Sequence, residues 1–446
     1  MLFRSAGGFS LGFNFQAQAQ SAMNAPGAPA HTTTPEVNAW VVIEPDDKVV
    51  IRIARSEMGQ GTLTGLAQLV AEELECDWNK VAWEYPTPGQ NVARKRVWGN
   101  FATGGSRGIR ESNEYVRKGG AAARQMLVQA AANEWNVPAA ECKVSKGVIT
   151  HKSGKKTTYG KVAAAAAKLT PPDPKDIKLK DAKEWKIAGK PLKRLDTVDK
   201  TTGKQIYGID VRLPGMLIAA IRDCPVNGGT VKSFDASKVQ GMPGVKKVVQ
   251  VGKTGVAVVA DNFYNAKTAV AALPVTWDDG VGWNASSATI AEFLKEGLTA
   301  EQAYIGNRAG DAKATLAAAA KKVEAVYAWP YQNHAPMEPM NATVRYTADK
   351  CEVWCPTQNA EAALAAASEA SGLPIAKCDV YKMHLGGGFG RRGRTDYVTQ
   401  AVQIAKEMPG TPVKLIWTRE EDMQHCAFHP VTQCKMSATL GDDGKI

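Results

Sequence analysis

The chain has 446 residues, enough for two or three domains, and 44% hydrophobic and 22% charged residues, a balance that excludes disordered and fibrous classes. Its net charge of +11 suggests an anionic partner, but many of the excess lysines alternate with apolar and acidic residues in "KDIKLKDAKEWKIAGKPLKR". Nucleic-acid binding would require basic residues interleaved with several aromatics, so we interpret this run as a solvated connector and expect no nucleic-acid partner.

Residues 1–35 have the outline of an export signal. They contain one arginine, a short glycine-rich apolar run and an Ala-Gln-Ala sequence. Twin arginines are absent, so either the true start lies upstream or these residues form a loose tail, and we expect a clipped signal of the twin-arginine type. No stretch approaches the ~18 consecutive apolar residues that span a bilayer.

Residues 36–170 are expected to form a first unit. "NAWVVI" and "VVIRIA" flank the turn "EPDDK" as a hairpin of alternating strands, which leads directly into "SEMGQGT". Apolar residues at helical spacing in "LTGLAQLVAEELECD" place Gly59, Gln60 and Gly61 just ahead of a helix N-terminus.

A second glycine loop of this unit, "ATGGSRGIR", contains Gly104 and Gly105 with Arg107 and Arg110. It precedes the long helical pattern "ESNEYVRKGGAAARQMLVQAAANEW", so two predicted helix starts carry glycine. The Pro- and Lys-rich residues 171–188 are expected to form a linker.

Beyond the linker, residues 189–285 are expected to form a small α+β domain with the strand patterns "QIYGIDVRLPGMLIAAIRD", "VKKVVQV" and "GVAVVADNFYNAKTAVAALPVTWDD". Helix and strand patterns then alternate in residues 295–446: helix "DAKATLAAAAKKVEAVY", strands "NATVRYTA" and "CEVWCPT", helix "NAEAALAAASEAS", strand "AKCDVYKMHL", loop "GGGFGRR", helix "TDYVTQAVQIAKE" and strand "VKLIWTR". Asp442, Asp443 and Gly444 signal a hairpin turn with only two residues after it, so we expect this domain to be incomplete at its C-terminus.

The eight cysteines form no CxxC pair and no regular framework, which argues against a zinc ribbon and against a disulfide scaffold. Cys351 and Cys355 would lie about 13 Å apart along one strand, too far for a disulfide, and are expected to be buried thiols. The stretch "HCAFHPVTQC" fits no common metal-ligand spacing, so we interpret it as a hairpin and expect no side-chain metal site.

The third glycine loop matches G-x-G-x-x-G from Gly388 to Gly393, after a strand and before a helix, as in dinucleotide-binding folds. The match is poor, because the preceding strand carries Lys382 and His384 and no acidic residue follows at the expected distance. For any single loop, a glycine C-cap or a sharp connection is the alternative. Three loops that each open a helix, two of them flanked by arginines, favour one large phosphate-bearing cofactor held from several sides.

Six motifs resemble, in this order, the large molybdopterin-binding subunit of isoquinoline 1-oxidoreductase and its relative, the membrane-associated aldehyde dehydrogenase large subunit. They are "SEMGQGT", "TGGSRG", "HAPMEPMNATV", "CPTQNAEAA", "HLGGGFGRR" and "KLIWTREEDMQH". Both proteins belong to the xanthine dehydrogenase and aldehyde oxidase family of molybdenum hydroxylases. The resemblance runs from about residue 36 to the end. It implies an α+β fold with molybdopterin-binding domains of the xanthine dehydrogenase large-subunit type, in which residues 189–285 form an α/β hammerhead domain.

The resemblance also implies roles for single residues. The dithiolene and the molybdenum would be cradled by Gly387, Gly388, Phe389 and Gly390. Gln358 would hydrogen-bond an oxygen ligand of the metal, and Gln60, between Gly59 and Gly61, would reach the pterin edge. The pterin or its phosphate would be enclosed by the loop of Gly104 and Gly105, and its pyrophosphate held by Arg391 and Arg392. Structural support of the funnel would come from His334 and Glu338.

The activity that the resemblance implies is hydroxylation of an electron-poor carbon with oxygen from water. The base would be a glutamate near the C-terminus of the full-length relatives, and no residue here matches it, so we expect it beyond Ile446 and expect this chain alone to be inactive. The implied cofactor is molybdopterin cytosine dinucleotide with molybdenum. Electrons would leave through a small [2Fe-2S] subunit and a c-type cytochrome, on the periplasmic side of a bacterial membrane.

Two departures from the xanthine dehydrogenase pattern argue against a purine substrate. Gly393 stands where that branch has a substrate-contacting glutamate, and Phe428 stands where it has a substrate-binding arginine. An N-heteroaromatic compound or an aldehyde remains as substrate. The alternatives in other classes are a non-catalytic remnant or binding module of the same fold and, ranked third, a flavin- or nicotinamide-dependent dehydrogenase.

Overall fold

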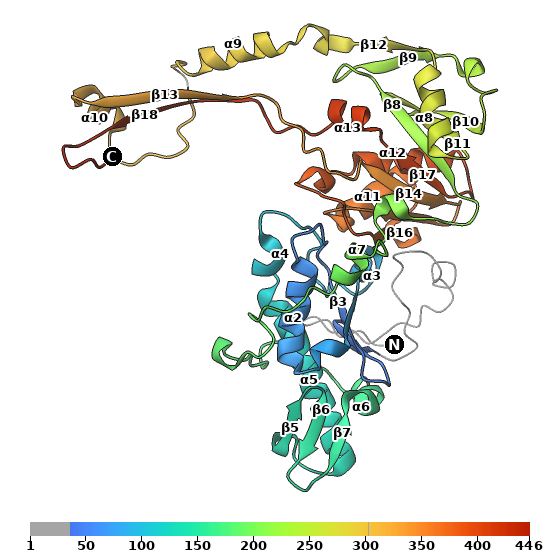
Figure 1. Ribbon diagram of the computed structural model, residues 1–446, viewed down its shortest axis with the longest axis vertical. Coiled ribbons are helices and arrows are strands. Elements are labelled where there is room, and N and C mark those ends of the chain that lie inside the picture. Colours follow the sequence, from blue (N-terminus) through green and yellow to red (C-terminus); the bar gives the residue numbers. More distant parts are fainter. Residues whose placement is uncertain (1–35, 302) are drawn as a thin grey trace.

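The computed structural model describes residues 36–301 and 303–446, and the expected export signal in residues 1–35 lies outside the described residues. Two bodies of mixed helix and sheet follow one another along the chain, and a long two-stranded ribbon projects from the second (Figure 1). The predicted α+β class is therefore confirmed.

The first body is built on a four-stranded sheet in the order β1-β2-β3-β4. The predicted hairpin is confirmed, because β2 and β3 pair antiparallel with Val41 opposite Ile51. The helices α2 and α5 share one apolar core with this sheet. The elements are β1 (Glu36–Asn38), β2 (Val41–Ile43), β3 (Val49–Arg52), α2 (Thr62–Leu74), β4 (Val81–Glu84), α3 (Pro88–Ala93), α4 (Arg107–Arg110) and α5 (Asn113–Trp135).

Helices α2 and α5 pack closely because of a glycine in the middle of α5. A Cβ on Gly120 would lie 2.4 Å from the carbonyl oxygen of Val70, so no larger residue fits without moving the helices apart. A three-stranded sheet, β5 (Cys142–Ser145), β6 (Val148–His151) and β7 (Lys156–Thr158), and α6 (Tyr159–Ala166) complete the first body. The glycine-containing pattern "RKGGAAAR" thus marks a helix crossing.

The predicted linker, residues 171–188, is packed on the first body, so its interpretation as a solvated connector is wrong in part. The buried carboxylate of Glu72 accepts backbone N–H groups from Lys186 (2.8 Å), Ile187 (2.6 Å) and Ala188 (3.1 Å). The ammonium of Lys180 donates to the Glu72 carboxylate at 3.1 Å. Spacing along the sequence could not show this, because Glu72 lies more than 100 residues before the residues that it anchors.

The second body is built on a seven-stranded sheet in the order β10-β11-β8-β17-β14-β15-β16. Helices α11 and α12 share one core with one face of the sheet, and α8 packs on the other face over β8 and β11. The elements are α7 (Thr197–Thr201), β8 (Leu217–Asp223), β10 (Val245–Val251), β11 (Gly255–Ala260), α8 (Phe263–Ala272), β14 (Asn341–Tyr346), β15 (Cys351–Cys355), α11 (Ala360–Ser371), β16 (Cys378–Lys382), α12 (Asp396–Lys406), β17 (Val413–Ile416) and α13 (Arg419–Gln424).

The segments 189–285 and 295–446 share this sheet, since β8, β10 and β11 come from the first segment and β14 to β17 from the second. The join is the parallel pair of β8 and β17, with Leu217 beside Val413. The strands β9 (Thr230–Phe234) and β12 (Val275–Asp278) form a separate antiparallel pair. The hammerhead domain stays a prediction from the resemblance.

The helix predicted for residues 311–327 is wrong in its second half. Helix α10 covers only Ala312–Ala318, and β13 (Lys322–Trp329) then pairs antiparallel with β18 (Thr432–Thr439). The same pairing corrects the hairpin predicted around "HCAFHPVTQC", because β18 pairs with β13 and not with an adjacent strand. Helix α9 (Ser287–Gly297) lies beside this ribbon (Figure 1). Within the described residues all eight cysteines are free thiols, and Cys351 and Cys355 are buried as predicted.

Candidate functional site

The three glycine loops meet at their bases in a buried polar cluster that we call the loop junction: Ser56, Thr103, Thr357 and Gln358. The backbone N–H of Ser56 donates to the Thr103 hydroxyl at 2.9 Å, and the Ser56 hydroxyl donates to the Thr357 carbonyl at 2.8 Å. The Gln358 side chain donates to the Thr103 carbonyl at 2.9 Å, and the Thr103 N–H donates to the Gln358 carbonyl at 2.7 Å. Segments about 300 residues apart in sequence are thereby fixed to one another.

The GGGFG loop, residues 386–390, closes over this junction. The Gly390 N–H donates to Gln358 Oε1 at 3.0 Å. A Cβ on Gly388 would lie 2.7 Å from Gln358 Oε1 and 2.9 Å from Met58 Sδ, so only glycine leaves room where this loop meets the GQG loop. Phe389 projects at the tip of the loop and is 69% exposed. The predicted convergence of these two loops is therefore seen in the structure.

The GQG loop, residues 59–61, is organised by the buried carboxylate of Glu57. Glu57 Oε1 accepts the N–H groups of Gly59 (2.8 Å) and Gly61 (3.0 Å), and Oε2 accepts that of Leu63 (3.0 Å). Arg194 donates to the same carboxylate at 2.9 Å. The free N–H groups at the start of α2 are thus satisfied by an internal anion, and this helix end does not need a ligand to satisfy it.

Gln60 turns back onto its own loop. Its Oε1 accepts the Met58 N–H at 2.7 Å, and its Nε2 donates to the Ser56 carbonyl at 3.0 Å. Gln60 and Gly59 are exposed, and a Cβ on Gly59 would meet nothing within 4 Å. In this state Gln60 stabilises the loop from its surface, next to open space.

The TGGSRG loop opens a shorter helix than predicted. Gly104 and Gly105 lead into the single turn α4 (Arg107–Arg110), while α5 begins only at Asn113. A Cβ on Gly104 would meet nothing within 4 Å, and Gly105 is exposed. In the same way, the GGGFG loop opens a 3-10 turn, Arg391–Gly393, ahead of α12. Of the three predicted helix starts, only the one at Gly61 opens a long helix directly.

Two family models with the same description, molybdopterin cofactor-binding domain, match residues 8–209 and 296–446. The first match contains the GQG and TGGSRG loops, and the second contains the GGGFG loop. This chain belongs to the molybdopterin cofactor-binding family. The resemblance and the fold class inferred from the sequence motifs are confirmed.

Curated relatives within this family are similar over most of the chain. Isoquinoline 1-oxidoreductase subunit beta of Brevundimonas diminuta is 29% identical over 90% of this chain and 57% of its own length. The membrane-bound aldehyde dehydrogenase [pyrroloquinoline-quinone] of Gluconacetobacter polyoxogenes is 31% identical over 88% of this chain and 52% of its own length. The chain thus spans about half the length of these two relatives.

Among solved structures, quinoline 2-oxidoreductase from Pseudomonas putida 86 is similar with a TM-score of 0.45 and 20% identity. The match covers 56% of this chain and 37% of that one.

The arginines of the GGGFGRR motif are not placed to hold a pyrophosphate, which corrects the role expected for them. Arg391 is fully buried and forms a two-fold ion pair with Asp396, at 3.0 and 2.8 Å. Arg392 is also fully buried; it donates to the Gly387 carbonyl at 2.8 Å and to the Glu338 carboxylate at 3.2 Å. Both guanidinium groups therefore stabilise the loop region through buried contacts within the protein.

Glu338 fulfils the supporting role predicted for it. Its carboxylate accepts the Gly386 N–H at 2.8 Å and, through its other oxygen, the Ile209 N–H at 2.9 Å. Because Ile209 follows α7, this one side chain joins the GGGFG loop to the segment ahead of β8. Glu57 and Glu338 therefore play the same part in two of the three glycine loops: each is a buried acid that accepts several backbone N–H groups.

His334 lies beside the GGGFG loop but near the surface. Its Nδ1 is 3.3 Å from the Cys426 thiol, and its ring stacks on His429 with centroids 4.6 Å apart. Burial and the neighbouring His429 lower the pKa of His334, so the ring is neutral near pH 7. A Cβ on Gly390 would lie 3.7 Å from His334 Nε2. Within residues 36–301 and 303–446 no group of three metal-ligating side chains is suited to a metal ion.

The buried residues Lys382 and His384 were noticed in the sequence only as a poor fit to a parallel strand. The Lys382 ammonium donates to the carbonyls of Ile53 and Ala54 and lies 4.4 Å from the centre of the Tyr85 ring. Burial lowers the pKa of Lys382 well below its usual value, and burial lowers that of His384 to about 4. His384 Nε2 has no hydrogen-bond partner. Glu57 and Arg194 were missed; an acidic residue directly before a glycine loop is the signal that could have found Glu57.

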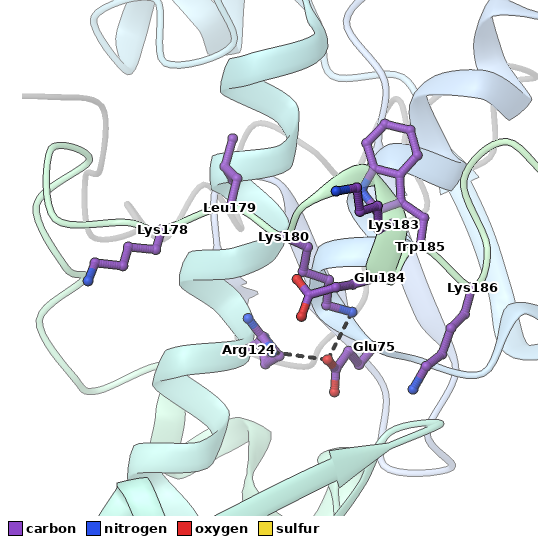
Figure 2. A pocket seen from close by; sticks show the side chains of 9 residues that line it. All are labelled: Glu75, Arg124, Lys178, Leu179, Lys180, Lys183, Glu184, Trp185 and Lys186. Carbon is purple, nitrogen blue, oxygen red and sulfur yellow. Dashed lines mark hydrogen bonds and ion pairs between the residues drawn. The ribbon is translucent and has the colours of Figure 1, made fainter.

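The hollow shown in Figure 2 has a volume of about 660 Å³ and lies at the other end of α2, beside Glu75. Its floor is neutralised, since Glu75 pairs with Arg124 at 3.1 Å and with Lys180 at 2.8 Å. The lysines at its rim diverge, with Lys178 and Lys186 pointing to opposite sides (Figure 2). A phosphate group would need cations that converge on it, so this hollow does not have the geometry of a phosphate-binding site. None of the described helices is long and apolar enough to cross a membrane.

Proposed function

We propose that this chain is the molybdopterin-binding part of a molybdenum hydroxylase that oxidises an N-heteroaromatic compound or an aldehyde with oxygen from water. The observation that carries the proposal is the junction of the three glycine loops around Gln358, within two matched molybdopterin cofactor-binding domains. Two of the relatives, an isoquinoline oxidoreductase and an aldehyde dehydrogenase, support these two substrate classes.

The residues present fit a flat cofactor laid against the loops. Side-chain-free backbone at Gly59 and Gly104 borders open space, while Gly388 leaves clearance that a Cβ would fill. The loops are already tied to one another by internal hydrogen bonds, so they form a preorganised surface. Phe389, exposed at the loop tip, offers a ring against which one wall of the bound group would rest.

The residues of this chain would hold the cofactor and orient it. One hydrogen of the Gln358 amide donates to Thr103 and its oxygen accepts from Gly390, which leaves a second amide hydrogen to donate toward the bound group. Gln60 could exchange its bonds within the loop for bonds to the pterin edge. When bound, the molybdenum centre would supply the redox chemistry that hydroxylates the substrate carbon. The base glutamate was not matched among these residues and is expected elsewhere.

The cytosine dinucleotide form of the cofactor, a small [2Fe-2S] subunit, a c-type cytochrome and a periplasmic location belong to the same proposal. They are supported by the resemblance to the isoquinoline oxidoreductase branch and by the signal-like composition of residues 1–35. The absence of an iron–sulfur cysteine pattern from the sequence agrees with electron transfer to a separate subunit.

A binding module without the metal is the second candidate, and one observation favours it. Backbone N–H groups of the GQG loop are satisfied within the protein, as their bonds to the Glu57 carboxylate show. Such loops can keep their shape when the cofactor is absent.

Metal and pterin analysis separates the two candidates. The chain is produced in a molybdenum-replete bacterial host and assayed for molybdenum by mass spectrometry, for oxidised pterin by fluorescence, and for cytidine monophosphate after acid release. We expect about one molybdenum and one pterin per chain. Protein with neither group would overturn the hydroxylase proposal and support the binding module. Adenosine or guanosine monophosphate in place of cytidine monophosphate would overturn only the cytosine form.

A further inference from the structure

The ribbon formed by β13 and β18 has one apolar face. In an antiparallel pair, residues directly opposite one another point to the same side of the sheet, and neighbours along a strand alternate. The register pairs Val323 with Ala438, and Tyr327 with Cys434, and therefore fixes the two faces. The apolar face consists of Val323, Ala325, Tyr327, Trp329, Thr432, Cys434, Met436 and Ala438.

The opposite face of the same ribbon is mainly polar and partly occupied. Glu324 accepts a hydrogen bond from the Ser437 hydroxyl at 2.7 Å and pairs with Lys435 at 3.6 Å. Gln433, also on this face, donates to the Ala291 carbonyl of α9 at 3.0 Å. Polar side chains thus pair with one another on this face, and α9 contacts part of it.

The apolar face is open in the described structure. Val323 is 57% exposed, Tyr327 is 49% exposed and Met436 is 61% exposed. The Tyr327 and Trp329 rings stack with centroids 6.0 Å apart, so the exposed apolar surface is continuous. At the end nearer the second body, the rings of Tyr331 and Phe428 lie 5.9 Å apart. The next residue, His429, stacks on His334, whose Nε2 would lie 3.7 Å from a Cβ on Gly390 of the GGGFG loop.

A ribbon of this kind is not stable on its own in water. Two strands without a third strand or a packed face are marginal, and the eight residues of β13 extend about 26 Å at strand rise. Figure 1 shows the ribbon projecting from the second body, and within residues 36–301 and 303–446 its sheet contains only β13 and β18. A continuous exposed apolar surface on such an element marks a docking site.

The relatives indicate what covers this face. They match almost all of this chain, yet 43% of the isoquinoline oxidoreductase subunit has no counterpart in it, since the match covers 57% of that protein. We propose that the apolar face of the β13–β18 ribbon is the docking surface for the polypeptide equivalent to this unmatched part of the relatives. The face leads to the GGGFG loop, so the docked polypeptide would also close over the loop junction. The inference does not depend on which substrate is oxidised or on which form of the cofactor is bound.

The chain offers a matched pair of valines for the test. Val323 and Val326 lie on the same strand and are equally exposed, at 57%, but Val323 is on the apolar face and Val326 on the opposite one. The wild-type chain, Val323→Lys and Val326→Lys are each co-expressed with the polypeptide of the same organism that matches the remaining part of the relatives. Binding is measured by co-purification and by analytical ultracentrifugation.

We expect the wild type and Val326→Lys to bind the polypeptide with similar dissociation constants, and Val323→Lys to bind at least tenfold more weakly. Hydrogen exchange of the wild-type complex should show backbone amides of residues 322–329 protected relative to the free chain. Circular dichroism spectra of both variants must match that of the wild type. The proposal is overturned by equal weakening in the two variants, by a complex in which β13 gains no protection, or by no association of the wild type.

Discussion

At the scale of single residues, Gly388 is the position on which the cofactor loops depend most closely. Its Cα lies between Gln358, which belongs to the loop junction, and Met58, which belongs to the GQG segment. The Gln358 side chain is not free to give way, because its amide is hydrogen-bonded on both sides. Space at this one residue therefore determines whether the loops can stay together.

Gly388→Ala should separate the GGGFG loop from the GQG loop, because the new methyl group would lie 2.7 Å from Gln358 Oε1. Overpacking of this kind lowers the free energy of unfolding by about 1–3 kcal/mol. The denaturation midpoint in urea checks the stability, and the pterin content of the purified protein checks cofactor retention, which should fall several-fold.

Gly393→Ala is the matched control, since it lies in the same motif and its Cβ would meet nothing within 4 Å. It should leave both the midpoint and the pterin content unchanged. Equal effects of the two substitutions would show that the clearance at Gly388 is not important.

The sequence revealed the glycines of the loops and, through the resemblance, Glu338, but it did not reveal Glu57 or the partners of the two arginines. Arg391 and Arg392 suggested phosphate contacts because unpaired arginines near a helix start commonly bind anions. Their actual partners are Asp396, at the start of α12, and Glu338, some 50 residues earlier. A pattern of charges shows that an ion pair is possible, but only folding decides which carboxylate reaches the guanidinium group first.

At the scale of elements, α13 is docked on β8 through a cluster of titratable groups. Glu421 accepts the Asp223 N–H at 2.6 Å, and His425 Nε2 lies 3.3 Å from the Glu421 carboxylate. Burial raises the pKa of Glu421 to about 8 and also raises that of Asp223. Burial lowers the pKa of His425. The Glu421 carboxyl is therefore mostly protonated, and uncharged, near neutral pH.

Glu421 should make the stability of the protein fall as the pH rises. The folded state keeps a proton on Glu421 up to about pH 8, whereas the unfolded chain releases it near pH 4.5, so the free energy of unfolding decreases between these values. Between pH 7 and pH 8 the pH approaches the pKa of Glu421 in the folded state, so the loss from this group over that unit is about 1 kcal/mol. Urea denaturation at pH 7.0, 7.5 and 8.0 measures the slope.

Glu421→Gln should remove most of this slope, because the amide cannot ionise. Glu420→Gln, at the neighbouring exposed position on α13, should keep the slope of the wild type. An unchanged slope in Glu421→Gln would assign the pH dependence to other groups.

The elements with strong patterns were predicted correctly, and the ribbon shows why one was not. Residues 311–322 are rich in alanine and lysine, which favour helix, and this preference was extended through Tyr327. From Val323 onward valine and aromatic residues become frequent, which favours a strand. A change of preference over so short a stretch is decided only by the partner strand, more than 100 residues later.

At the scale of the whole molecule, Lys382 connects the two bodies by hydrogen bonds. It lies on β16 of the seven-stranded sheet, and its ammonium reaches the carbonyls of Ile53 and Ala54, which follow β3 of the first body. Asp379 on the same strand accepts the Thr87 hydroxyl at 2.7 Å. Two residues of one strand, Asp379 and Lys382, thus join the body that carries two glycine loops to the body that carries the third.

Lys382→Met should loosen this connection, because two buried carbonyls lose their donor. The expected decrease in the free energy of unfolding is about 1–3 kcal/mol. In calorimetry we expect the single unfolding transition to broaden or divide as the bodies uncouple. Lys377→Met, at a lysine that is 47% exposed, is the control and should change stability by less than about 0.5 kcal/mol. If Lys382→Met is as stable as this control, the hydrogen bonds of Lys382 do not hold the two bodies together.

The pairing of β8 with β17 affects how the nascent chain folds on the ribosome. Leu217 lies beside Val413, so the middle of the large sheet stays open until nearly 200 further residues have been translated. At 5–20 residues per second that interval lasts roughly 10–40 s. The first body can mature in this time, whereas β8, β10 and β11 expose an unpaired edge to the cytoplasm. A chaperone that shields nascent β-strands would therefore act on residues 217–260 before any other part of the large sheet.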